Sequence, residues 1–241
     1  MSAMKVLFIG NSHTYFNDMP ALFADMCEAL SGERADVTML AYSNRTLDWH
    51  CREYFSIRFA LLYGRYDRCV IQQFGHPMPP REKTEPFLDR LVALCRSVGT
   101  EPVLYMTWAK KNEPEQAARI SALYRALAEK YQTSLAPIAE LFDTLQKTHP
   151  DIELYWRDGS HASPYGTYLI AATLAALLVK PRDLSRLPDC VNDFQARFSE
   201  GEAPTACEDA ASVRKAADPA LTKAIRTAVE QTVLGHSGGE R

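Results

Sequence analysis

Three stretches of the chain repeat the same order of an amphipathic run, a glycine and a short apolar run. They read MPALFADMCEALSGERADVTMLAY, REYFSIRFALLYGRYDRCVIQQF and TEPFLDRLVALCRSVGTEPVLYMTW. We expect each amphipathic run to be a helix that ends at its glycine (Gly32, Gly64 or Gly99) in the left-handed conformation. The continuous apolar runs suit strands of a parallel sheet covered on both faces. With residues 5–9 as an opening strand, this alternation predicts a doubly wound α/β domain.

The pattern continues to about residue 180 and then weakens. We expect a helix over 114–131, a strand over 134–136, a helix over 138–147 and a last helix that begins at Pro164. These elements predict one domain over residues 4–180. Residues 181–241 are expected to form a C-terminal helical extension packed on the same domain, with a helix over about 210–233 that is broken near Pro219.

The net charge and the spacing of the cysteines argue against several classes of protein. A net charge of -3 and a pI near 6.1 give no electrostatic signature of nucleic acid or anionic membrane partners. The apolar run 6–9 is too short for the core of a secretory signal, and the most apolar helix, 168–179, is too short to span a bilayer. The six cysteines form no C-x-x-C pair. We therefore expect reduced thiols, no metal or other cofactor, and a cytoplasmic protein.

Ser12 stands at the exit of the first predicted strand. Ligands of open parallel sheets bind at the carboxyl ends of the strands, so this position favours chemistry. Gly10 permits a tight turn, and the helix that follows opens near Asp18 and Pro20. A nucleophilic serine needs such an exposed place beside backbone N–H groups. Taken alone, the turn favours a structural serine or a phosphate contact, as in flavodoxin-like proteins, over a nucleophile.

The segment YWRDGSH places Asp158 and His161 just before the last helix. Asp, Ser and Pro are also ordinary residues at a helix start, so a capping role is the alternative. In a hydrolytic triad, His161 would accept the serine proton while Asp158 orients the imidazole. A serine at the first strand exit together with D-x-x-H before the last helix predicts a hydrolase.

These two segments resemble the first and last sequence blocks of the SGNH (GDSL-type) hydrolases. IGNS is similar to the G-D-S block, with Asn11 in place of the aspartate, and DGSH is similar to D-x-x-H. The resemblance implies a flavodoxin-like three-layer α/β/α sandwich with a mainly parallel sheet of about five strands. It also implies metal-free esterase chemistry with Ser12 as nucleophile, His161 as base and Asp158 as the residue that orients it.

The third block of that family, G-x-N-D, is altered. In VIQQFGHPMPP, Gly75 fits the block but Pro77 takes the place of the asparagine that donates to the oxyanion. Gln72 and Gln73 are the available amide donors, and strand geometry turns only one of them toward a given face. Gln73 is slightly favoured. Both glutamines are equally explained as hydrogen-bonded residues at a strand end.

The second block falls in AYSNRTLDWH. We expect the backbone N–H of Ser43 or Asn44 to face the oxyanion, and Asn44 tolerates the unusual backbone angles of such a turn. His50 is interpreted as a surface or packing residue.

Aromatic residues follow several predicted strands: Tyr42, Trp108, Tyr155 and Trp156. Flat rings suit sugars or acyl groups but also suit the core. We expect Trp108 to face the site. His13 and Lys110 could contact an anionic part of a substrate, although an unpaired surface role is favoured for both.

The sequence therefore predicts a serine esterase that hydrolyses a small ester, such as an O-acetyl group on a carbohydrate, through an acyl-enzyme. Its partner would be the small-molecule ester, with no nucleic acid or membrane, and the oligomeric state stays open. The alternative is a flavodoxin-like protein that binds a phosphate, a nucleotide or a carbohydrate with little or no catalysis.

Overall fold

The computed structural model describes residues 3–193 and 214–235. The chain divides into two compact units, and each is described by itself. Unit 1 consists of Met1–Thr14 and Ala35–Glu140, and unit 2 consists of Tyr15–Arg34 and Leu141–Arg241. The predicted domain at 4–180 and extension at 181–241 follow other boundaries and stay a prediction.

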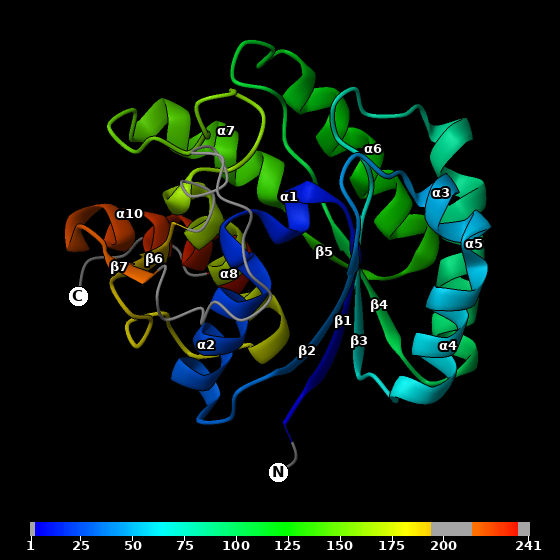
Figure 1. Cartoon of the computed structure of the whole chain (residues 1–241). Helices are drawn as coiled ribbons and strands as arrows, with labels where there is room; N and C mark the ends of the chain where they lie inside the picture. Colours follow the sequence, from blue (N-terminus) through cyan, green and yellow to red (C-terminus); the bar gives the residue numbers. More distant parts are fainter. Residues whose placement is uncertain (1–2, 194–213, 236–241) are drawn as a thin grey trace, which may run out of the picture. The chain divides into compact units, whose positions relative to one another are not determined.

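Unit 1 is built on a five-stranded parallel sheet (Figure 1). Its strands are β1 (Lys5–Gly10), β2 (Asp36–Ala41), β3 (Arg68–Gln72), β4 (Glu101–Tyr105) and β5 (Ser134–Ala136). They pair in the order β2-β1-β3-β4-β5. The prediction of an α/β fold with a parallel sheet of about five strands is confirmed.

The strand order places β1 between β2 and β3. The chain therefore reverses its direction of travel across the sheet at β1, and the exits of β1 and β3 lie next to each other. This reversal is where open α/β sheets bind their ligands. The side chains of Val6, Leu7, Phe8 and Ile9 are fully buried, as expected for a strand covered on both faces.

The helices of unit 1 connect these parallel strands. They are α3 (Leu47–Arg52), α4 (Tyr54–Gly64), α5 (Arg81–Ser97) and α6 (Gln116–Tyr131). Two other helices are divided between the units: α1 (Ser12–Tyr15), which follows β1, and α7 (Ile138–Thr148), which follows β5. Helices α3, α4 and α5 lie beside one another (Figure 1). The predicted helices over 114–131 and 138–147 match α6 and α7 to within two residues.

Two of the three expected glycine helix ends are confirmed. Gly32 and Gly99 have φ angles of 85° and 77°, in the left-handed region. The expectation for Gly64 was wrong, because Gly64 is the last residue of α4 and Arg65 takes the left-handed angle, with φ of 53°. Gly64 is needed for a different reason: a β-carbon there would overlap the ring of Tyr66.

Unit 2 consists mainly of helices. They are η1 (Phe16–Asp18), α2 (Met19–Ser31), α8 (Pro164–Val179), α10 (Pro219–Val229) and η3 (Glu230–Leu234), with a two-stranded antiparallel sheet of β6 (Cys190–Asn192) and β7 (Arg214–Ala216). Helix α8 packs against both α2 and α10 (Figure 1). It is buried along most of its length, which accounts for its uniformly apolar sequence.

The C-terminal helix is shorter than expected. Residues 210–213 lie outside the described residues, and residues 214–216 form β7 rather than the start of a helix. Helix α10 begins at Pro219, and the side chain of Asp218 caps it by accepting the N–H of Ala220 at 2.8 Å. Pro219 therefore starts a helix instead of breaking one, which is the usual place for proline. Within the described residues, no helix has the length and apolar character to cross a membrane.

Candidate functional site

The turn after β1 is closely packed around Gly10. A β-carbon at Gly10 would overlap Oγ1 of Thr14 and lie 2.5 Å from Oε1 of Gln72. Such approaches are not tolerated, so only glycine fits here. Ser12 comes two residues later, begins α1 and is partly exposed.

Gln72, the last residue of β3, forms hydrogen bonds with the turn that follows β1. Its Oε1 accepts the backbone N–H of Asn11 at 2.8 Å and the hydroxyl of Thr14 at 3.0 Å, and its Nε2 donates to the carbonyl of Gln73. The amide oxygen of Gln72, rather than its nitrogen, therefore faces the Asn11 backbone. Through its contacts with Asn11 and Thr14, Gln72 positions the turn at residues 10–14 that carries Ser12, here called the serine turn. Its role as an oxyanion donor stays a prediction.

Gln73 holds the two loops that follow β2 and β3. Its Oε1 accepts the backbone N–H of Leu47 at 3.0 Å and that of Phe74 at 2.8 Å. Its Nε2 donates to the hydroxyl of Thr84 at 3.2 Å. Both ends of this buried amide are thus engaged in unit 1, as in the alternative of a hydrogen-bonded strand-end residue, and the oxyanion role of Gln73 likewise stays a prediction.

The loop after β2 contains Asn44 in the left-handed conformation. Asn44 is exposed and has φ of 59°, which is the backbone property expected of it. The turn is closed by the N–H of Arg45, which donates to the carbonyl of Tyr42 at 3.2 Å. The carbonyl of Arg45 in turn accepts Nδ2 of Asn11 at 3.0 Å. Asn11, which replaces the aspartate of the family block, therefore links the loop after β2 to the serine turn.

His50 is a packing residue, which was one of its two expected roles. Its ring is 2% exposed, and Nε2 donates to the carbonyl of Gly10 at 2.7 Å. Burial lowers the pKa of His50, and the hydrogen bond to Gly10 only partly opposes that effect. A neutral His50 thus holds the backbone of the serine turn through its hydrogen bond to the Gly10 carbonyl.

His13 and Trp108 are buried together. The expectation that His13 is an unpaired surface residue was wrong, because its side chain is 5% exposed and contacts His76. The rings of His13 and Trp108 have their centroids 5.0 Å apart. Trp108 is fully buried, and its expected role in facing the site stays a prediction. Lys110 is paired rather than unpaired, with Nζ 3.4 Å from Oε1 of Glu113.

Unit 2 contains the Asp158–His161 pair. Nδ1 of His161 lies 2.6 Å from Oδ2 of Asp158, and the other carboxylate oxygen accepts the backbone N–H of Ser160 at 2.9 Å and of His161 at 3.0 Å. Partial burial alone would raise the pKa of Asp158. The hydrogen bonds from His161 and Ser160 outweigh burial, so the net pKa lies below its ordinary value. An ionised Asp158 holds the proton of His161 on Nδ1 and makes Nε2 the basic nitrogen.

A short loop presents this pair. Its ends are joined by a bridge between Tyr155 and Ala162, and the N–H of Trp156 donates to the carbonyl of His161 at 2.8 Å. The loop reverses at Gly159, whose φ of 67° is left-handed.

Asp158 does not cap the helix that follows it. The cap of α8 is Ser163, whose Oγ accepts the N–H of Gly166 at 3.0 Å. The capping alternative for Asp158 is therefore contradicted, since both of its carboxylate oxygens bind groups of the loop itself.

Phe16 and Asn17 also support this loop, and sequence reasoning missed both. The Phe16 ring stacks on His161 with centroids 4.1 Å apart and an interplanar angle of 12°. Nδ2 of Asn17 donates to the carbonyl of Ala162 and to the hydroxyl of Thr167, both at 3.1 Å. Asn17 is buried with a left-handed φ of 51°. The only signal in the sequence was an asparagine, a residue that tolerates this backbone, inside the segment YFNDMP.

No cluster of metal-ligating side chains occurs within the described ranges 3–193 and 214–235. Five of the six cysteines are described and are free thiols: Cys27, Cys51, Cys69, Cys95 and Cys190. Cys207 lies outside the described residues.

No family model matches the sequence, and no curated protein sequence matches it. Solved structures do match. Axe2, an acetylxylan esterase from Geobacillus stearothermophilus solved as a catalytic mutant, is 18% identical, with a TM-score of 0.57 over 72% of this chain and 93% of its own. The acetyl xylan esterase AlAXEase is 17% identical, with a TM-score of 0.58 over 71% and 98%. A lipolytic protein of the G-D-S-L family from Veillonella parvula is 13% identical, with a TM-score of 0.58 over 73% and 98%.

The chain has the SGNH (GDSL-type) hydrolase fold. The matched structures are covered almost completely, whereas more than a quarter of this chain lies outside each match. The SGNH fold agrees with the position of Ser12 directly after β1 and of the Asp158 loop directly before α8.

Proposed function

We propose that the chain is a serine esterase that hydrolyses small esters, with an O-acetyl group on a carbohydrate as its substrate class. The observation that carries the proposal is the Asp158–His161 pair, with its 2.6 Å contact on a dedicated loop. A binding protein has no need for an imidazole oriented by an ionised carboxylate. The SGNH fold and the serine turn after β1 support the same conclusion.

In the proposed reaction, Oγ of Ser12 attacks the ester carbonyl while Nε2 of His161 accepts the serine proton. Asp158 stabilises the imidazolium that forms. The tetrahedral intermediate collapses to an acyl-enzyme, and His161 returns the proton to the leaving alcohol. Water then attacks the acyl group with His161 as base, which releases the acid and regenerates Ser12.

Two features of the chain support this assignment. The orientation of Asp158 leaves Nε2 of His161 as the nitrogen that can accept a proton. Phe16, which stacks on the His161 ring, follows Ser12 by only four residues in the sequence. The segment that begins with the proposed nucleophile therefore also supplies the residue that fixes the plane of the proposed base.

Backbone N–H groups are proposed as the main hydrogen-bond donors to the oxyanion. The N–H groups of Ser12 and Asn44 are the candidates, because both follow strands that end at the same edge of the sheet. The side-chain amides of Gln72 and Gln73 are proposed as additional donors, since each NH₂ group carries two hydrogens and only one partner is assigned to each.

The substrate class draws on the titles of two matched structures, which describe acetylxylan esterases. A direct test is acetate release from acetylated xylooligosaccharides, followed by NMR, together with hydrolysis of p-nitrophenyl acetate. We expect turnover of both substrates and slower turnover of p-nitrophenyl esters with long acyl chains. Release of no acetate from either substrate, at any pH from 6 to 9, would contradict the proposal.

A further inference from the structure

Four polar groups form a continuous chain of contacts in unit 1. Nδ1 of His13 faces Oδ1 of Asn11 at 3.3 Å, and Nε2 of His13 faces Nδ1 of His76 at 3.1 Å. Nε2 of His76 contacts the carbonyl oxygen of Trp108 at 2.7 Å. His13 follows β1 and His76 follows β3, so the pair joins the two neighbouring strands at the reversal of strand order.

Both ends of this chain are hydrogen-bond acceptors. The carbonyl of Trp108 can only accept. The amide of Asn11 is oriented by two backbone groups, because its Oδ1 accepts the N–H of His13 at 3.1 Å and its Nδ2 donates to the carbonyl of Arg45 at 3.0 Å. Turning this amide over would place a donor against a donor and an acceptor against an acceptor.

The number of protons then follows from counting. Three contacts between two terminal acceptors need three N–H groups, whereas two neutral imidazoles carry two. These three hydrogen bonds together therefore require a third proton, and the His13–His76 pair with all three of them formed carries a charge of +1. With two protons, one contact is lost, and the contact between His13 and Asn11 is the longest of the three.

Burial and nearby charges decide how readily this pair takes up its third proton. His13 is 5% exposed, and burial disfavours the charged form of a histidine. The hydroxyl of Tyr105, which donates to the carbonyl of His13 at 2.8 Å, supplies no negative charge, because burial raises the pKa of Tyr105 well above its ordinary value. An anion near His76 would stabilise the third proton.

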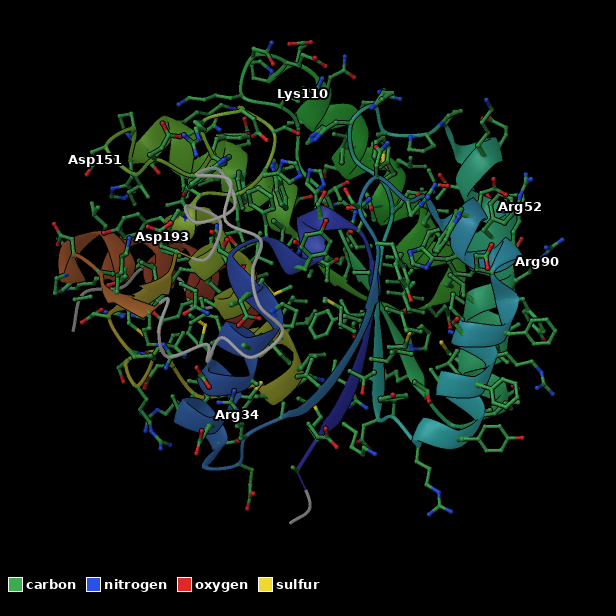
Figure 2. All side chains as sticks on the ribbon, viewed as in Figure 1. Arg34, Arg52, Arg90, Lys110, Asp151 and Asp193 are labelled. Carbon is green, nitrogen blue, oxygen red and sulfur yellow. The ribbon has the colours of Figure 1, made fainter. Side chains whose placement is uncertain are left out.

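A pocket of about 210 Å³ lies beside His76 at the ends of β3 and β4. Its lining contains two permanent cations, Lys110 and Arg119, and a single carboxylate, Glu113, which is paired with Lys110 at 3.4 Å. Figure 2 shows Lys110 on the loop that joins β4 to α6. With the third proton on the histidine pair, the charged groups at this pocket sum to +2.

We propose that this pocket binds a small oxyanionic group, a carboxylate or a phosphate, and that binding is coupled to uptake of one proton by the His13–His76 pair. Lys110 and Arg119 donate hydrogen bonds to the anion. His76 acts through its charge, since both of its ring nitrogens already contact His13 and Trp108. The pocket holds one such group, which is either a free anion or the acidic part of a larger ligand.

The pH dependence has a definite sign. A bound anion raises the pKa of the pair, so the anion stabilises the protonated form and is itself bound more tightly by it. Affinity is therefore greatest below the pKa of the unliganded pair and falls as pH rises through the range between the two pKa values, by up to about tenfold per pH unit.

The test is isothermal titration calorimetry of the full chain with inorganic phosphate and, separately, with acetate. Each titration is done between pH 5.5 and 8.5, in two buffers of different ionisation enthalpy. Acetate stays ionised over this range, so its titration reports the protons of the histidine pair, whereas the protons that phosphate itself exchanges are subtracted from the phosphate titration. We expect binding with uptake of up to one proton by the pair and with affinity that falls above neutral pH. Binding of phosphate alone would identify a phosphate-type ligand, and binding of both would identify a general oxyanion site. Binding without proton uptake at any pH, or no binding of either anion, would overturn the proposal.

Two variants distinguish anion binding in the pocket from proton uptake by the histidine pair. Lys110→Ala should weaken phosphate binding at least tenfold and keep the proton uptake, whereas His76→Asn should bind with little dependence on pH. Lys111→Ala, one residue from the pocket lining, is the matched control and should bind as the wild type does. An unchanged affinity in Lys110→Ala would contradict the site. Circular dichroism verifies folding, and the assay needs no turnover, so its outcome is independent of the proposed esterase activity.

Discussion

Replacing Ser12 by alanine is expected to lower kcat for p-nitrophenyl acetate by about 10⁴-fold. The substitution removes the only atom that can form the acyl-enzyme in the proposed reaction and leaves the backbone of the turn in place. Ser56→Ala is the matched control, because Ser56 is an exposed serine of α4 whose side chain has no assigned role. The measurement is steady-state hydrolysis followed at the p-nitrophenolate absorbance, with circular dichroism to verify folding.

His161→Ala is expected to lose about as much activity as Ser12→Ala, and the double variant should lose little more than either single one. Residues that act as one catalytic unit show this lack of additivity, whereas independent contributions would multiply. If Ser12→Ala kept wild-type kcat, or if the two losses multiplied, Ser12 and His161 would not belong to one triad.

Gly10→Ala is expected to give the largest loss of stability, on the order of 3 kcal/mol in the free energy of unfolding. The new methyl group would overlap Oγ1 of Thr14 and approach Oε1 of Gln72 to 2.5 Å. Relief of that overlap must move Gln72, which breaks its hydrogen bond to the Asn11 N–H at 2.8 Å. A buried N–H without a partner is costly, and the shift displaces the serine turn as well. Urea denaturation gives the loss of stability, and hydrolysis of p-nitrophenyl acetate gives the loss of activity.

Gly32→Ala is the control for this substitution. A β-carbon at Gly32 meets no atom within 4 Å, so only the left-handed backbone, with φ of 85°, opposes alanine. That costs about 1–2 kcal/mol and leaves the activity of the remaining folded protein unchanged. Equal losses of stability in the two variants would show that packing around Gly10 is not what excludes a side chain.

The sheet was predictable because its strands are buried on both faces. A continuous apolar run at 6–9 opens the chain, further apolar runs follow the helix–glycine boundaries, and burial of the whole strand leaves little ambiguity. The details at Gly64 were not predictable. Its role depends on the ring of Tyr66, and periodicity carries no information about which side chain approaches a backbone atom.

The candidate site was predictable where a residue acts through its own chemistry. Asp158 and His161 are three residues apart, so their contact follows from local geometry. The roles of Gln72 and Asn17 depend on partners 61 and 145 residues away in the chain. A polar residue held by a distant backbone group looks in the sequence like any other loop or strand-end residue. His13 was misplaced for the same reason, since its partner His76 is 63 residues away.

The central claim is that Ser12 is the residue that becomes acylated. The most direct measurement is mass spectrometry of the protein after reaction with a fluorophosphonate, a reagent that attaches irreversibly to activated serines, followed by peptide mapping. The account predicts one adduct per chain on the peptide that contains Ser12, and its absence in both Ser12→Ala and His161→Ala. An adduct on another residue, or labelling of Ser12→Ala at the wild-type rate, would contradict the account.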